Sequence, residues 1–172
     1  MMWKVTSAAA AGLLALAPTM AAKTSDDGVV AHVAYTAGVI DVAAGKQALA
    51  KSKNEAVRAF AEEMVRDHGA VNEQALALVA KLHVTPRDNP TSAALNKAAA
   101  EASHKLSSLS GSSFDRAYVT NEVSFHRTVN GALRTTLIPN AHNPELKALL
   151  QTGLRLFSEH QMHAEALARK LR

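Results

Sequence analysis

The stretch that decides the fold is VRAFAEEMVRDHGAVNEQALALVAKL, residues 57–82. Its apolar residues recur at alternating steps of three and four, which is the spacing of one face of an amphipathic helix. His68 occupies a step of the same series. The other members are Val57, Phe60, Met64, Val71, Ala75, Leu78 and Leu82. The pattern therefore predicts a long helix that carries a histidine on its buried side.

Length and composition predict one all-α domain. The chain has 172 residues, of which 48% are hydrophobic but only 4% aromatic. The excess is alanine and leucine, which favour helices over strands. The formal net charge of +4 is spread along the chain. Because there is no basic run interleaved with aromatic residues, nucleic acid is not expected as a partner.

Residues 1–22 have the pattern of a secretory signal peptide. Lys4 precedes an apolar run from Val5 to Leu16, and Pro18 follows it, with cleavage expected after Ala21 or Ala22. The alternative is an uncleaved anchor helix, but spanning a bilayer takes about 20 apolar residues and this run is shorter. We expect export to the periplasm or the medium, with association to the envelope as a variant, and no membrane span after the signal is removed. The chain has no cysteine for a lipid anchor or a disulfide.

The remaining chain, residues 28–171, divides into four long helical segments and one irregular connection. Asp26 or Asp27 is placed to cap the first helix. Ser52 and Glu55 have the spacing of a capping box at the start of the second. Pro139 is expected to stop the third helix, and Asn143 with Pro144 to start the fourth. The predicted helices are residues 28–49, 53–83, 113–138 and 144–171, with a crossover at residues 84–112.

The crossover is long enough to return along the whole length of the bundle, so the second and third helices can run parallel. The inward face of the first helix has two readings. One is the line Ala34, Ala37, Asp41, Ala44 and Ala48, and the other is the line Val30, Val33, Ala37, Ile40 and Ala44. In either reading Asp41 lies on or beside the core face.

Ionisable residues stand in the apolar seams of the later helices as well. Glu122 and His126 are one turn apart in the third helix, and His160 lies in the seam of the fourth. Burying these groups with His68 and Asp41 costs several kcal/mol unless each finds a partner. The partner is either another member of the set or a metal ion. Imidazole and carboxylate ligands suit zinc, copper, iron, nickel or manganese, so one transition-metal ion is the candidate cofactor.

Residues beside these seams are candidates for orienting the ligands. Asp67 either positions an imidazole or pairs with a surface arginine. The other candidates are Asp115, Tyr118, Glu159 and His163. His104, in the polar crossover, is expected to be exposed to solvent.

Several motifs together resemble a known family. They are AFAEEMVRDH at residues 59–68, FDRAY at 114–118, the Glu122 to His126 pair, and His160. They resemble the exported bacterial family catalogued as domain of unknown function 4142, over about residues 29–167. The resemblance implies a ferritin-like, up-down four-helix bundle with a long crossover between helices two and three. It implies no established activity and no particular metal, and some members are labelled outer-membrane or exported proteins.

Ferritin-like di-iron proteins use carboxylates from two helices and Glu-x-x-His from the other two. This chain departs from that pattern: Asp67 directly precedes His68, Glu122 and His126 are four apart, and no glutamate lies three before His160. A mononuclear, histidine-rich site agrees better with these positions.

Three classes of function remain open at this point. The first is a metal- or ligand-binding bundle that acts in metal handling or stress. The second is a non-enzymatic envelope protein in which the cluster is only a buried polar network. The third is a redox enzyme that uses the same metal. The sequence does not identify a protein partner or a homo-oligomer.

Overall fold

The computed structural model describes residues 26–171 and is all-helical over that range. The expected signal peptide, residues 1–22, lies outside the described residues. The elements are α1 (Asp27–Lys51), α2 (Glu55–Lys81), α3 (Pro90–Ser107), α4 (Gly111–Ala132), the π-helical segment η1 (Leu133–Leu137), α5 (Ile138–Asn140) and α6 (Pro144–Lys170).

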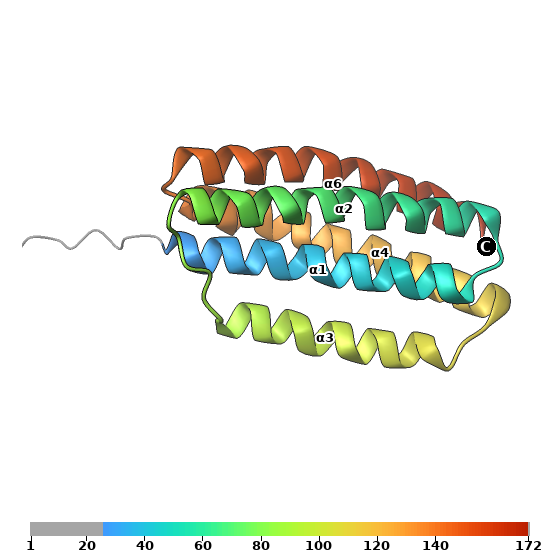
Figure 1. Ribbon diagram of the computed structural model, residues 1–172. Coiled ribbons are helices and arrows are strands. Elements are labelled where there is room, and N and C mark those ends of the chain that lie inside the picture. The colour runs from blue at the N-terminus through green and yellow to red at the C-terminus, as the bar shows by residue number, and fades with distance from the viewer. Residues whose placement is uncertain (1–25, 172) are drawn as a thin grey trace, which may run out of the picture.

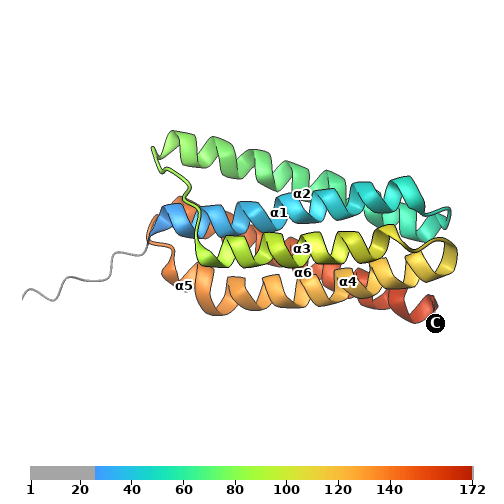
Figure 2. The same cartoon turned by 90° about the horizontal axis from the view of Figure 1, so that it is seen from below.

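The long helices lie side by side along one axis (Figure 1). α1 and α2 form an antiparallel pair, and α4 and α6 form another. Contacts of α2 with α6 and of α1 with α4 join the two pairs. α3 packs on the outside against α1 and α4, and it carries the chain back along the bundle, so that α2 and α4 run in the same direction (Figure 2).

Asparagine and aspartate side chains cap most of the long helices. Asp26 accepts hydrogen bonds from the first turn of α1, and Asn143 does the same for α6. The second helix differs from the expected capping box. Its cap is Asn54, and Ser52 instead ends α1 and donates its hydroxyl to Asp115 at 2.6 Å. Asn54 Oδ1 accepts hydrogen bonds from the backbone N–H groups of Ala56 and Val57, at 3.0 and 3.2 Å.

The end of α4 also differs from expectation. The helical chain does not stop before Pro139 but continues through η1 and α5 to Asn140. In η1 the N–H of Ile138 bonds to the carbonyl of Leu133, five residues back. A wider turn of this kind accommodates the loss of a donor at proline without ending the helix.

The buried face of α1 takes residues from both predicted lines. Val30 and Val33 are buried from one line, Asp41 and Ala48 from the other, and Ala37 belongs to both. Small residues lie on the same face. A Cβ on Gly45 would come within 2.9 Å of Val65 Cγ2 and 3.0 Å of the Ala61 carbonyl oxygen, so α1 and α2 are in close contact there.

By length and composition alone, α1 is also apolar enough to span a membrane. Half of its most apolar stretch is buried in the bundle, and a core helix satisfies the same criterion. The expectation that no segment after the signal peptide could span a membrane therefore holds for the described helices other than α1. Apart from α1, no helix within residues 26–171 meets this criterion.

Two apolar clusters fill the bundle, one toward each end. The first includes Ala37, Val79, Val129 and Phe157. The second includes Ala48, Met64, Val119 and Ala164. On each of the four core helices, one or two buried ionisable residues lie between members of the two clusters, whereas buried Asp115 lies beside the second cluster. These residues, Asp41, His68, Glu122, His126 and His160, form what we call the polar layer.

A matched pair of glycine substitutions tests the α1–α2 contact. Gly45→Ala should lower the free energy of unfolding by about 1–3 kcal/mol, because the added methyl overpacks the interface. Gly69→Ala in α2 should raise it by about 0.5–1 kcal/mol, because nothing lies within 4 Å of its Cβ and alanine is the better helix former. Urea unfolding of the metal-free protein measures both. Equal effects at the two positions would contradict the close contact.

Candidate metal centre

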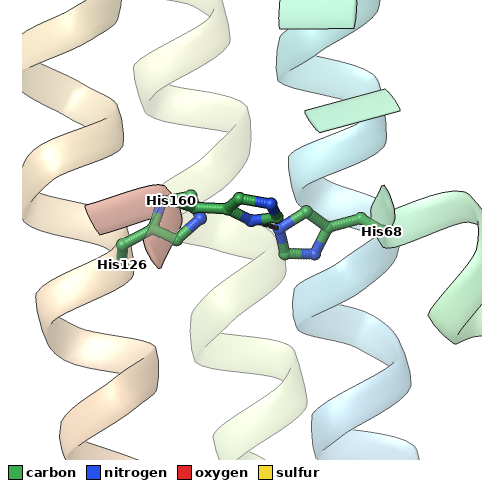
Figure 3. Close-up of side chains that lie close together, drawn as sticks. All are labelled: His68, His126 and His160. Atoms are coloured by element: carbon green, nitrogen blue, oxygen red, sulfur yellow. Dashed lines mark hydrogen bonds between the residues drawn. The ribbon is translucent and has the colours of Figure 1, made fainter. Parts of the chain in front are cut away.

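The polar layer brings together side chains from α1, α2, α4 and α6. Asp41, His68, Glu122, His126 and His160 are each 2% exposed or less. His68, His126 and His160 point toward one another from three different helices (Figure 3). Their ring centroids are 5.2–5.7 Å apart. Rings at this separation can share one small ion or contact one another directly.

Asp41 lies between two of the imidazoles. Its Oδ2 atom is 2.9 Å from His68 Nε2 and 3.3 Å from His126 Nε2. Neither oxygen of Asp41 receives a hydrogen bond with good alignment, although both are buried. The carboxylate is therefore held mainly by its neighbours His68, His126 and Glu122.

His126 is oriented by its own helix. Its Nδ1 lies 3.0 Å from the backbone carbonyl of Glu122, one turn earlier, and only an N–H can bond to that oxygen. This contact assigns the proton to Nδ1. Nε2 is then left with a free lone pair directed into the layer, where it has no aligned hydrogen-bond partner. A backbone carbonyl behind one ring nitrogen is the usual arrangement for a histidine that ligates through the other.

His160 uses both ring nitrogens. Nδ1 is 3.3 Å from His68 Nε2, and Nε2 is 3.0 Å from Asp67 Oδ2. Asp67 also accepts a hydrogen bond from Arg66 at 2.7 Å. The two readings of Asp67 therefore both hold, since it pairs with a surface arginine and orients a buried imidazole.

His68 is fixed by stacking as well as by charge. The ring of Phe157 lies parallel to it, with centroids 4.2 Å apart and an interplanar angle of 10°. This contact covers one face of the imidazole with apolar surface. His68 can then engage polar partners only through its edge, where Asp41 and His160 are found.

The two buried carboxyl groups differ in charge. Burial raises the pKa of Glu122 well above its ordinary value, and the nearby Asp41 charge raises it further. Burial alone would also raise the pKa of Asp41, but the adjacent imidazoles, His68 first, outweigh it and lower the pKa to about 2. The layer thus favours the charged form of Asp41 and the neutral form of Glu122.

Burial disfavours the charged form of two of the imidazoles, His126 and His160. Burial lowers the pKa of His126, and the charge of Asp41 offsets this only in part. Burial likewise lowers the pKa of His160 against the opposing hydrogen bond to Asp67. Neutral imidazole is the form that binds metal ions.

The donor atoms are close enough to surround one ion. One ligand atom from each of His68, His126 and His160 lies within 4.8 Å of the other two, and the same is true of the set Asp41, Glu122 and His126. Because His126 belongs to both sets, the two overlap. The layer can thus offer a three-histidine tripod with a carboxylate beside it, a donor set suited to a first-row transition metal.

The other residues named from the sequence lie around the layer rather than in it. The exposed imidazole of His163 contacts Glu63 at 2.7 Å. Tyr118 is fully buried, and its hydroxyl has no hydrogen-bond partner. Asp115 bonds to Ser52 and so ties α4 to the end of α1. Glu159 is exposed and contributes nothing to the cluster.

Two residues near the layer were missed by sequence reasoning. Glu63 forms a third metal-capable group with Asp67 and His160. Its position one turn before Asp67 was the available signal. Asn130, one turn after His126, is fully buried and donates to the carbonyl of Phe157 at 3.1 Å.

His104, expected to be exposed, is exposed in the structure. It provides a histidine remote from the layer for use as a control.

Fold and site together define an all-helical protein with buried histidine and carboxylate groups that could hold a metal ion. The family model described as "Domain of unknown function (DUF4142)" matches residues 13–167. The chain therefore belongs to that family. A search of the curated proteins finds no match. A search of the solved structures finds none either.

The stability of the metal-free protein should fall on acidification. Because the pKa values of His126 and His160 are lowered in the folded state, the unfolded chain takes up protons first, at about pH 6.5. Stability is then complete above that pH and is lost as the pH falls toward the folded values, by at most about 1.4 kcal/mol per pH unit for each histidine. Urea unfolding in chelator from pH 8 to 5 measures this.

His126→Gln should reduce the loss of stability per pH unit on acidification, because one buried titrating group is removed. His104→Gln is the matched control at an exposed site. Stability independent of pH between 7 and 5 would contradict the neutral, buried state of these rings.

Proposed function

We propose that this protein is an exported, ferritin-like four-helix bundle that binds one transition-metal ion. The proposed ligands are His68, His126 and His160, with Asp41 and Glu122 as neighbouring acids. The role we propose is non-enzymatic metal handling, or protection under metal or oxidative stress.

The observation that carries this proposal is the convergence of three buried imidazoles on one point. Their metal-binding atoms are within 4.8 Å of one another, and each ring comes from a different helix. Several polar atoms around that point lack an aligned hydrogen bond: both oxygens of Asp41, His68 Nδ1, Glu122 Oε2 and His126 Nε2. Unpartnered buried polar atoms cost about 1–3 kcal/mol each. A cation bound by His126 Nε2 beside Asp41 would offset part of that cost.

The helix arrangement supports the ferritin-like part of the proposal. Two antiparallel pairs are joined by a segment that returns along the bundle, and the ionisable residues lie midway along the core helices. Metal sites in bundles of this type are built from inward side chains on facing helices. The donors here are mainly imidazoles rather than paired carboxylates, which favours one metal ion over a dinuclear site.

Export is supported by the signal-like pattern of residues 1–22. In an extracytoplasmic compartment a chain without cysteine depends on imidazole and carboxylate groups for tight binding of a transition metal.

A second candidate function has its own supporting observation. Each buried imidazole already has a polar neighbour from the protein: Asp41 for His68, the Glu122 carbonyl for His126, and Asp67 for His160. The layer could then be a self-contained network that sets the register of the helices in an envelope structural protein. Buried polar groups play that role in some bundles.

Metal titration separates the two candidates. Protein purified without a histidine tag should bind one equivalent of zinc, copper, iron, nickel or manganese, by elemental analysis after dialysis. At a metal concentration about 100 times Kd, binding should stabilise the fold by about 2.7 kcal/mol. For a chain of this size that corresponds to a rise in Tm of roughly 5–10 °C. No bound metal and no thermal shift with any of the five ions would leave only the structural role.

His126→Ala and the closer mimic His126→Gln should both abolish the metal-dependent shift, since each removes the Nε2 ligand. His104→Ala should leave the shift unchanged, because His104 lies on the exposed helix α3. A normal shift in folded His126→Gln would exclude this residue as a ligand.

A further inference from the structure

A second group of metal-binding side chains lies on the outward side of His160. Glu63 and Asp67 are one turn apart on α2, and they face His160 and His163 on α6. The contacts cross the helix interface in pairs: His163 Nδ1 to Glu63 Oε2 at 2.7 Å, and His160 Nε2 to Asp67 Oδ2 at 3.0 Å. Ligand atoms of Glu63, Asp67 and His160 all lie within 4.8 Å of one another.

These side chains form a continuous row from solvent to the polar layer. The exposed fraction of the side chain falls from 47% at His163 to 28% at Glu63, 17% at Asp67 and 0% at His160. At the inner end, His160 Nδ1 contacts His68. A polar path therefore leads from the surface between α2 and α6 to the three buried imidazoles.

The apolar clusters lie on both sides of the layer along the bundle axis. An ion that entered along the axis would lose its hydration shell with no ligand to replace it, which costs many kcal/mol. On the row between α2 and α6, carboxylate oxygens and imidazole nitrogens replace water stepwise. The row is thus the lower-energy route to the centre of the bundle.

His160 belongs to both groups through opposite ring nitrogens. Nε2 faces the outer carboxylates, and Nδ1 faces the inner imidazoles. A neutral imidazole has one lone pair, so it ligates through one nitrogen at a time. An ion held on Nε2 and an ion held on Nδ1 therefore use different tautomers of the same ring.

We propose that Glu63, Asp67 and His160, assisted by His163, form an outer site that captures a divalent transition-metal cation and passes it to the inner triad of His68, His126 and His160. This inference rests on the proposed metal-binding function. The outer site is an entry site, so its contribution is to the rate of loading, while the inner triad sets the final affinity.

Loading of the full-length, metal-free protein with cobalt(II) tests the proposal, because the visible absorption of bound cobalt reports its ligands. In rapid mixing, Glu63→Gln should slow the appearance of the inner-site spectrum by about tenfold, since a charge that focuses cations at the entrance is lost. Its equilibrium affinity for cobalt and its final spectrum should match those of the unsubstituted protein. The hydrogen-bond partner of Glu63 is His163, which is not part of the inner triad.

Glu62→Gln is the matched control, with the same change of charge on an exposed neighbour. It should load at the unaltered rate. Asp67→Asn should both slow loading and weaken the final affinity, by about 10–100-fold, because Asp67 also orients the His160 ring.

The experiment distinguishes failure of the entry site from failure of the inner metal site. Equal loading rates for Glu63→Gln and Glu62→Gln would overturn the entry site and leave the inner metal site intact. A changed final spectrum in Glu63→Gln would make Glu63 a ligand of the stable site and would also overturn the proposal. Absence of cobalt binding by the unsubstituted protein would overturn the entry site, and the proposed function would fall with it only if none of the five ions above binds.

Discussion

The structure depends on one constraint, a charged carboxylate buried in the middle of an apolar bundle. Asp41 is 1% exposed and remains ionised because His68 and His126 are adjacent to it, at 2.9 and 3.3 Å. An isolated buried charge would be too costly for a domain whose net stability is only about 5–15 kcal/mol. The helices that supply the two imidazoles must therefore meet α1 at the level of Asp41.

The same constraint sets the register of the whole bundle. On each core helix, the residues of the polar layer lie between members of the two apolar clusters. If one helix slid by a turn, about 5.4 Å, its polar residue would enter an apolar cluster and an apolar residue would face Asp41. Close contact between α1 and α2 at Gly45 supports this alignment, because a bulkier residue would separate the helices that carry Asp41 and His68.

The two carboxyl groups of the polar layer have pKa values shifted in opposite directions, which leaves a negative charge available to a cation. Burial raises the pKa of Glu122 well above its ordinary value, whereas the neighbouring imidazoles lower the pKa of Asp41 to about 2. The backbone carbonyl of Glu122 holds the proton of His126 on Nδ1 and leaves Nε2 free. On the outer side, the carboxylate of Asp67 lies next to His160. The arrangement places imidazole nitrogens beside carboxylates, which favours a cation.

How far the sequence predicts this protein can be judged from particular residues. Periodicity predicted helices close to α1, α2, α4 and α6, and it put His68, His126 and His160 in apolar seams where all three are now found buried. The spacing of apolar residues is a local property, so it carries over directly to which side of a helix is buried. For Asp41 the sequence left two faces open, because α1 is apolar almost all round.

Two local signals failed. The cap of α2 is Asn54 rather than Ser52, whose hydroxyl bonds to Asp115, more than sixty residues later. Proline at position 139 did not end the helix, since the π turn of η1 absorbs it.

The sequence by itself therefore determined the helices and the buried side of most of them. Only the tertiary structure decided which ring nitrogen faces which oxygen, that Asp67 serves both Arg66 and His160, and that Glu63 continues the row to the surface. The physical reason is that these contacts depend on the register between α2 and α6. That register is set by packing across the bundle and not by any nearby stretch of chain.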